Sequence, residues 1–215
     1  MILIMSSIFL FLFINCAAID QKNIEQTIAH YEYTINEHPS DANAHLQIAQ
    51  LYLIQGRFIE GWQELEWHLG YKPDFTRNAQ HYLQTHQRLD GKIVLLSAEW
   101  GAGDTLWLMR YAHILKERGA HVILHVLHDS LIPLLKQQPY FDEILPRAAS
   151  NIPCHFEIPI MSLPMVFGTT LETVPAEIPY VQINQQLVDR WHDRLSSDQN
   201  FKIGICWHGN TIHGQ

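Results

Sequence analysis

The sequence predicts an α/β protein in which an α-helical hairpin precedes a parallel β-sheet domain. From Gly91 onward, short apolar runs typical of strands buried on both faces alternate with amphipathic helical runs. Such alternation is typical of βαβ units, whose strands pair in parallel. Between residues 42 and 69 the apolar residues recur at helical spacing instead. An apolar content of 47% over 215 residues is enough for one or two domains with a sizeable core.

Charge and cysteine usage argue against several functional classes. The formal net charge is −8 and the 14 Lys and Arg are scattered, whereas a nucleic-acid surface needs them clustered. The 14 His form no HExxH arrangement and stand beside no CxxC pair, so we predict no metal site. Cys16, Cys154 and Cys206 are odd in number and far apart, which suits a reducing compartment better than a disulfide framework.

The N-terminal segment, residues 1–19, is almost wholly apolar and reads MILIMSSIFLFLFINCAAI. It lacks the basic n-region of a signal peptide, and Asn15 before Cys16 is a poor match to a lipoprotein processing site. A run of about 18 residues is borderline for spanning a bilayer. Lys22 after the run weakly favours a cytoplasmic C-terminal side. A signal peptide, a membrane anchor and a buried helix therefore remain open.

Two helices are predicted next, over residues 42–55 and 57–69, with Gly56 between them. The second helix carries one apolar stripe at spacings i, i+4, i+7 and i+11, formed by Phe58, Trp62, Leu65 and Leu69. A shift of 34 residues, the separation of Pro39 and Pro73, places a similar stripe earlier in the chain: Ile24, Tyr31 and Ile35. The polar residues 74–90 are interpreted as a linker.

The elements after Gly91 follow from apolar runs and their breakers. Buried-type strands are predicted at 92–98, 121–127, 143–146, 155–160 and 201–207. Helices are predicted at 105–118, 130–138 and 185–195. Residues 162–181 contain too much Pro, Thr and Gly for a regular element and are interpreted as a long loop.

The turn at residues 99–104 (EWGAGD) would lie at the carboxyl edge of the first strand, where ligands bind such sheets. It lacks the third glycine of a dinucleotide fingerprint and the Lys-Ser/Thr pair of a P-loop. Spacing alone favours Asp104 as the cap of the following helix. The presence of Glu99 and Trp100 in the same turn favours a further role. A carboxylate at a helix N-terminus is expected to stay ionised.

The helical region resembles a tetratricopeptide repeat. The positions that carry the resemblance are Ile48, Ala49, Tyr52, Gly61, Leu65 and Pro73. The chain departs from the repeat at Gly61 and His68, where the consensus has Ala. One and a half repeats over residues 20–73 are too few for the groove of a peptide receptor. A hairpin packed on the next domain is therefore favoured over a binding array.

Residues 91–210 resemble the glycosyltransferase-like domain that follows such repeats in many bacterial proteins, itself similar to the heptosyltransferases (glycosyltransferase family 9, GT-B fold). The resemblance is carried, in order, by AEWGAGD (98–104), Arg110-Tyr111, MSLPMVFGTT (161–170), residues 175–180 and ICWHGN (205–210). GRFIEGWQELEW (56–67) resembles the last repeat that usually precedes this domain. It implies a Rossmann-like domain over residues 91–200 that forms the N-terminal, acceptor-binding half of a GT-B enzyme.

The resemblance also implies the chemistry and the residues that perform it. Gly103-Asp104 matches the family's Gly-Asp pair, so Asp104 is the expected catalytic base of an inverting, metal-independent transfer from a nucleotide sugar to an acceptor hydroxyl. No cofactor is expected. The expected acceptor cleft is lined by Glu99, Trp100, Gly101, Gly103, Ser162, Gly168 and Thr169.

Residues 201–215 would begin the donor-side domain. The expected donor-phosphate loop is Trp207, His208, Gly209 and Asn210, in which relatives usually carry a small residue at the position of His208. Because the sequence stops before most of that domain, we expect an incomplete fragment that is inactive as given. The alternative is a non-catalytic scaffold whose helices bind a protein partner. We further expect a sugar or glycan as the acceptor and a cytoplasmic location. Membrane contact is expected through residues 1–19.

Overall fold

The computed structural model describes residues 21–70, 81–83, 88–198 and 200–204, with the side chains described from Asn23 onward. The chain has a mixed α/β fold built around a four-stranded parallel sheet. It divides after Gln182 into two compact units, which we describe separately. The expectations for residues 1–19 and for Trp207, His208, Gly209 and Asn210 lie outside the described residues. No helix in the described ranges is long and apolar enough to cross a membrane.

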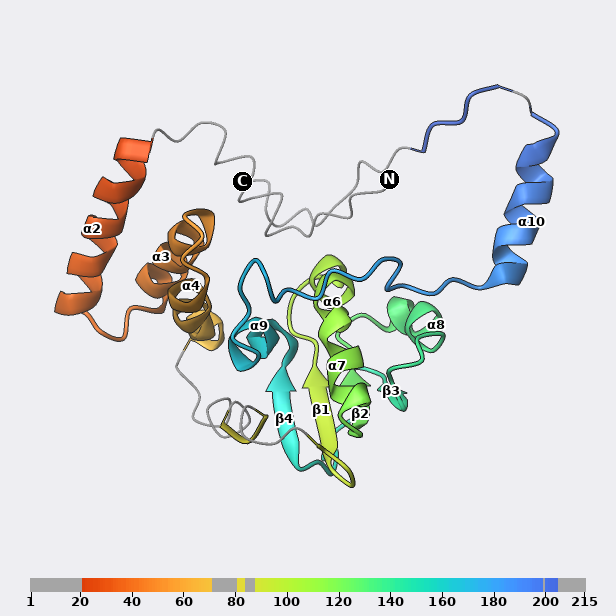
Figure 1. Ribbon diagram of the computed structural model, residues 1–215, viewed down its shortest axis with the longest axis horizontal. Helices are drawn as coiled ribbons and strands as arrows, with labels where there is room; N and C mark the ends of the chain where they lie inside the picture. Colours follow the sequence, from red (N-terminus) through yellow and green to blue (C-terminus); the bar gives the residue numbers. More distant parts are fainter. Residues whose placement is uncertain (1–20, 71–80, 84–87, 199, 205–215) are drawn as a thin grey trace. The chain divides into compact units, whose positions relative to one another are not determined.

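The first unit begins with helices that pack one after another along the sequence (Figure 1). They are α2 (Gln21–Glu37), α3 (Ala42–Ile54), α4 (Phe58–Leu65) and the 3₁₀ helix η1 (Glu66–Leu69). Asp41 caps α3 by accepting a hydrogen bond from the Ala44 amide at 3.0 Å. An ideal Cβ at Gly61 would lie 2.7 Å from Cγ of Leu53, so the absence of a side chain lets α3 and α4 approach closely.

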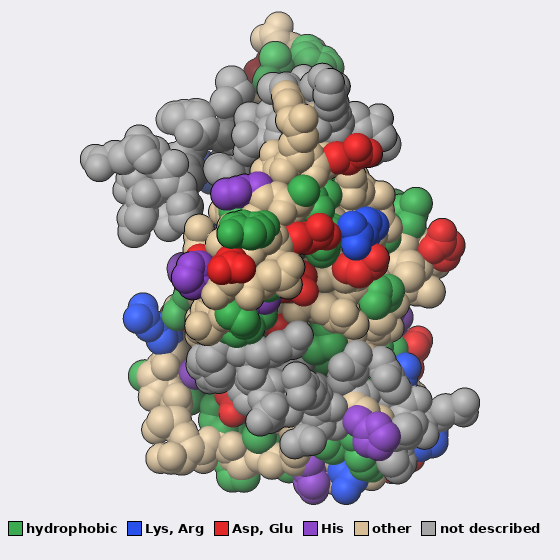
Figure 2. Space-filling model, turned by 90° about the vertical axis from the view of Figure 1, so that its left-hand side faces the viewer, with side chains coloured by type: hydrophobic (Ala, Val, Ile, Leu, Met, Phe, Trp, Pro, Cys, Tyr) green, Lys and Arg blue, Asp and Glu red, His purple; other side chains and the backbone are tan. Residues whose placement is uncertain are grey.

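These helices carry mainly acidic charge. Arg57 is the single Lys or Arg between residues 23 and 70. The side of the molecule that Figure 2 turns toward the viewer shows carboxylate and histidine side chains in several places and few basic groups. A phosphate backbone would be repelled by such a surface, because its neutralisation requires clustered Lys and Arg.

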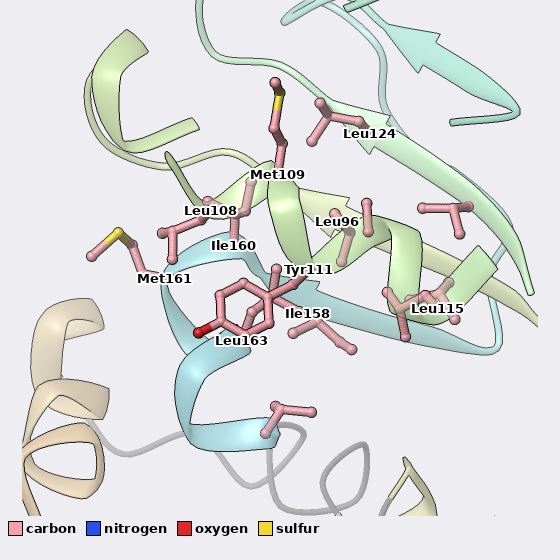
Figure 3. Close-up of a cluster of buried hydrophobic side chains, with 14 of the residues drawn as sticks. Leu96, Leu108, Met109, Tyr111, Leu115, Leu124, Ile158, Ile160, Met161 and Leu163 are labelled. Atoms are coloured by element: carbon pink, nitrogen blue, oxygen red, sulfur yellow. The ribbon is translucent and has the colours of Figure 1, made fainter. Parts of the chain in front are cut away.

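The sheet contains β1 (Ile93–Ser97), β2 (His121–His125), β3 (Glu143–Leu145) and β4 (Phe156–Pro159) in the order β3-β2-β1-β4. All three strand pairs are parallel, as the alternation of strands and helices predicts. In the register, Leu96 of β1 stands between Leu124 of β2 and Ile158 of β4. All three side chains are fully buried, so the central strands contribute directly to the hydrophobic core (Figure 3).

Short helices connect and cover the strands. They are α6 (Ala102–Leu108), η2 (Met109–Tyr111), α7 (Ala112–Glu117), η3 (Asp129–Leu131), α8 (Ile132–Leu135), η4 (Ile160–Ser162) and α9 (Leu163–Val166). The helix predicted at 105–118 begins earlier and changes to a 3₁₀ turn at η2. Leu108, Met109 and Leu115 from this segment pack into the same core as β1 and β2 (Figure 3).

The prediction of an irregular loop at 162–181 is wrong in its first part. Residues 163–166 form α9, because Pro164 lies in the first helical turn, where its missing N–H leaves no helical hydrogen bond unmade. The segment is also buried, with Leu163 and Val166 fully inside the core. In the segment interpreted as a linker, Leu83 and Leu89 are likewise buried in that core.

The second unit contains α10 (Gln185–Ser196), which confirms the helix predicted at 185–195. Asn184 caps it by accepting from the Leu187 amide at 3.2 Å. The strand predicted at 201–207 is wrong for residues 201–204, which form no strand, and its remainder lies outside the described residues. An apolar run becomes a strand only where another strand pairs with it, and the described chain pairs none with residues 201–204.

Candidate functional site

The order in which strands are added to the sheet reverses between β1 and β4, although the two strands run parallel. The chain steps from β1 to β2 and β3 on one side, then returns to place β4 on the other side of β1. Ligands of open α/β sheets bind outside the carboxyl ends of the strands at such a reversal. The predicted residues 99–104 follow β1, and η4 with Ser162 follows β4. The tertiary structure thus brings the two segments to one edge of the sheet.

Asp104 is the third residue of α6, and its carboxylate caps that helix. The Gly101 amide donates to Oδ2 of Asp104 at 3.0 Å. Asp104 thus caps the start of the helix from within its first turn, whereas the prediction placed it before a helix beginning at Thr105; the N-cap residue is Gly101. The residue is only 4% exposed. Its second oxygen, Oδ1, is buried and has no hydrogen-bond partner among the described residues. One oxygen therefore holds the start of the helix, and the other is buried without a hydrogen-bond partner among the described residues.

Burial shifts the pKa of Asp104 upward, opposite to the direction expected from a position at a helix N-terminus. Removal from water raises the pKa of this carboxyl, and the backbone hydrogen bonds from Gly101 and from its own amide oppose the rise without cancelling it. A carboxylate with a raised pKa is a stronger proton acceptor than an ordinary aspartate.

Glu99 is held by two segments that are far apart in the sequence, η1 and η4. Nε2 of His68, in η1, lies 3.0 Å from Oε1 and 3.3 Å from Oε2 of Glu99. The Met161 amide, in η4, donates to Oε2 at 3.4 Å. The second ring nitrogen of His68, Nδ1, lies 2.9 Å from the Leu65 carbonyl oxygen. The side chain of His68 is fully buried and that of Glu99 is 15% exposed.

The protonation of His68 is set by opposing influences. Burial alone lowers the pKa of this imidazole, but the hydrogen bond to Glu99 and the negative charge of that carboxylate raise it further, with a net shift upward. The upward shift in pKa favours the imidazolium form of His68. A buried ion pair of this kind connects the helices to the turn after β1.

Ser162 and Trp100 belong to the same neighbourhood. The Ser162 hydroxyl donates to Oε2 of Glu66 at 3.1 Å, and both residues are buried. The Trp100 ring stands edge-on to the His68 ring at 6.0 Å between centroids. Three of the predicted site residues, Glu99, Trp100 and Ser162, are thus brought together by side chains of η1.

Gly168 and Thr169 belong to a different junction. Gly168 has φ +58 and follows the last turn of α9, where glycine accepts the left-handed conformation. The Thr169 hydroxyl lies 2.9 Å from the Tyr111 hydroxyl, and its carbonyl accepts from the Trp62 indole N–H at 2.8 Å. Burial raises the pKa of Tyr111 to about 12. This junction holds the helices against the sheet, and these packing contacts account for the presence of Gly168 and Thr169 without a role in a ligand site.

Sequence reasoning missed four residues that organise these contacts: Trp62, Glu66, His68 and Tyr111. The sequence did contain an indication for His68, which stands where the repeat that the helical region resembles has alanine. A buried ionisable residue at a helix–helix packing position indicates a specific partner. Glu66 carried no such indication, since an isolated glutamate in a helix is ordinarily on the surface.

Replacement of Trp62 by phenylalanine is expected to lower the free energy of unfolding by about 1–3 kcal/mol. The ring volume is largely kept, but the buried Thr169 carbonyl loses its indole donor. Denaturant unfolding followed by circular dichroism measures the change. Trp191→Phe on the exposed face of α10 is the matched control and should be nearly neutral. Equal stability of the two variants would contradict this role of the indole N–H.

The described residues contain no group of three His, Cys, Asp or Glu side chains arranged to hold a metal ion. Comparison of the chain with protein-family models, with curated proteins and with solved structures finds no match. The site is therefore interpreted from its own geometry.

Proposed function

We propose that this chain carries the acceptor-side, Rossmann-like half of a GT-B glycosyltransferase, preceded by a tetratricopeptide-like helical hairpin. The observation that carries the proposal is the buried carboxyl of Asp104, which has one oxygen without a partner among the described residues. It lies just after β1, at the edge of the sheet where the strand order reverses. A base for an acceptor hydroxyl needs a proton-accepting oxygen that no other donor already occupies.

In the proposed reaction, Oδ1 of Asp104 takes the proton of an acceptor hydroxyl as that oxygen attacks the anomeric carbon of a nucleotide sugar. The bond from the anomeric carbon to the phosphate oxygen breaks on the opposite face, and the nucleoside diphosphate leaves with the electron pair. The configuration at carbon is thereby inverted. The raised pKa of Asp104 assists the transfer of the proton, while Glu99 and Trp100 would contact the acceptor.

The helical contacts support the finer assignment of the first segment. The close approach of Gly61 to Leu53 and the sequential packing of α2, α3 and α4 fit a repeat of paired helices. Trp62 and His68 then attach α4 and η1 to the sheet. Such attachment favours a hairpin built onto the catalytic half over a free peptide-binding array.

A non-catalytic scaffold is the second candidate, and one observation favours it. Glu99 and Ser162, two of the predicted acceptor contacts, already pair with His68 and Glu66 of the same chain. If these pairs persist in every state, this part of the site is a structural junction and the helices serve a protein partner.

The test is Asp104→Asn in the longest available product of the gene, assayed with UDP-, GDP- and ADP-linked hexoses and a panel of sugar acceptors. Turnover is expected to fall at least about a hundredfold, because the amide cannot accept the proton. The melting temperature at pH 7 should stay equal or rise. The folded state binds the Asp104 proton more tightly than the unfolded state, so ionisation at neutral pH costs stability that asparagine does not lose.

Asp189→Asn, on the exposed surface of α10, is the matched control and should leave turnover unchanged. Retained turnover in Asp104→Asn would remove Asp104 from the mechanism. Calorimetric titration of the present chain with the same nucleotide sugars separates the two candidates further. An absence of heat at millimolar donor would argue against a donor site within these residues.

A further inference from the structure

We propose that His68 is a positioning residue for the Glu99 carboxylate, and that the pair is a charge-dependent latch holding η1 against the turns that follow β1 and β4. The latch requires no transfer chemistry at Asp104 and goes beyond the proposed reaction. It assigns to the helical segment a direct part in shaping the edge of the sheet where the predicted site lies.

The geometry of the His68 ring carries the proposal. Nδ1 lies 2.9 Å from the Leu65 carbonyl oxygen and Nε2 lies 3.0 Å from Glu99 Oε1. The Leu65 carbonyl can only accept, and an ionised Glu99 carboxylate can only accept, so both ring nitrogens donate when Glu99 is ionised. A neutral imidazole has one N–H, whereas the imidazolium has two. The fully buried side chain leaves no water to replace a lost partner.

The groups that face His68 come from each element packed around it. Glu99 from the turn after β1 and Glu66 from η1 itself supply the negative charges that act on the ring. From η4 come the Met161 amide, which donates to Glu99, and the Ser162 hydroxyl, which donates to Glu66. Neither of these two groups titrates near neutral pH. The His68 ring is thus influenced by two glutamates, and both of these glutamates accept hydrogen bonds from η4.

Loss of the His68 proton would remove one of the two ring donors, so that only one of the contacts with Glu99 and the Leu65 carbonyl oxygen could remain a hydrogen bond. One ring nitrogen would then present a lone pair to an acceptor, which is repulsive in a buried site. His68 has a folded-state pKa above its ordinary value, so its contribution to stability is fully present below the unfolded pKa of about 6.5. The contribution is lost as pH rises through the folded pKa. Alkaline pH should therefore release η1 and uncover Glu99 and Ser162.

The experiment combines nitrogen-15 NMR of the histidine rings with hydrogen exchange of the whole chain across pH 5.5–9. The spectrum of His68→Gln identifies the His68 signals. We expect both ring nitrogens of His68 to be protonated at pH 7, with a titration midpoint above the ordinary value. Protection factors for residues 62–69 and for the Met161 amide, corrected for the intrinsic exchange rate, should fall at least tenfold through that midpoint.

Glu99→Gln is the decisive variant, because it keeps an acceptor and removes the charge. The His68 midpoint should fall by about one pH unit or more. In His68→Gln the step in protection should disappear, while His121→Gln, an exposed histidine beside Glu143, should leave it unchanged. If His68→Gln does not fold, the midpoint in Glu99→Gln still decides. A neutral His68 ring at pH 7, or a midpoint insensitive to Glu99→Gln, would overturn the latch.

The outcome is independent of catalysis at Asp104. A transferase assay that fails leaves the His68 titration as expected here. A failed titration leaves the base at Asp104 untouched, because the two side chains share no hydrogen bond.

Discussion

Replacement of Glu99 by alanine is expected to lower the free energy of unfolding by about 3–5 kcal/mol at pH 7. The carboxylate is the partner of a fully buried His68, and its removal leaves an imidazolium with no compensating charge at Nε2. It also removes the acceptor of the Met161 amide. The destabilisation by Glu99→Ala should be smaller at pH values above the His68 midpoint, because His68 of the wild-type protein has then lost its own positive charge. Urea denaturation at several pH values measures both effects.

A double-mutant cycle separates the pair from the general cost of substitution. Glu99→Leu and His68→Leu should each be destabilising, and the double variant should be less destabilised than their sum by about 0.5–3 kcal/mol, because two apolar groups replace an ion pair. Glu143→Ala, which removes the exposed partner of His121, is the matched control and should cost less than about 1 kcal/mol. Additivity within error would show that Glu99 and His68 are not energetically coupled.

Replacement of Leu96 by alanine is expected to lower the free energy of unfolding by about 2–5 kcal/mol. Leu96 is fully buried at the centre of β1, opposite Leu124 and Ile158 on its two neighbouring strands (Figure 3). Because hydrogen-bonded strands hold the backbone on both sides, the site can collapse only slightly around the cavity. The surrounding side chains then lose contacts that no relaxation restores.

The matched control is Leu171→Ala, since Leu171 is 71% exposed in the segment after α9. Its change should stay within about 0.5 kcal/mol. Equilibrium denaturation of both variants gives the comparison directly. Equal losses at the two positions would mean that β1 is not the centre of the core.

Much of the fold could be predicted because it depends on local pattern. The run Lys92–Ala98 is apolar and rich in branched residues, and such a segment has to be buried on both faces, as β1 is. The cap at Asp104 was also readable, because a carboxylate three residues after a turn glycine can reach back to that amide. Both predictions depend on residues within one turn or one strand of each other.

The strand at 201–207 and the loop at 162–181 show where local pattern fails. Apolar composition indicates that a segment prefers burial, but a segment becomes a β-strand only when it pairs with another strand. Residues 201–204 have no such neighbour in the described chain. Conversely, Pro and Gly in the segment after β4 suggested irregular backbone. Burial against the core instead stabilises α9, with Pro164 in its first turn and Gly168 after its last.

The sequence by itself determined the four strands of the sheet and the helix α10, and that the Asp104 carboxylate caps the start of the helix after the first strand. It also pointed to Glu99, Trp100 and Ser162 as residues of interest. Only the tertiary structure decided the strand order β3-β2-β1-β4, and with it the edge at which the turns after β1 and β4 meet. It also decided that Glu66 and His68 of η1 reach that edge. The reason is that hydrogen bonds between segments 30 to 100 residues apart depend on packing, which no local spacing encodes.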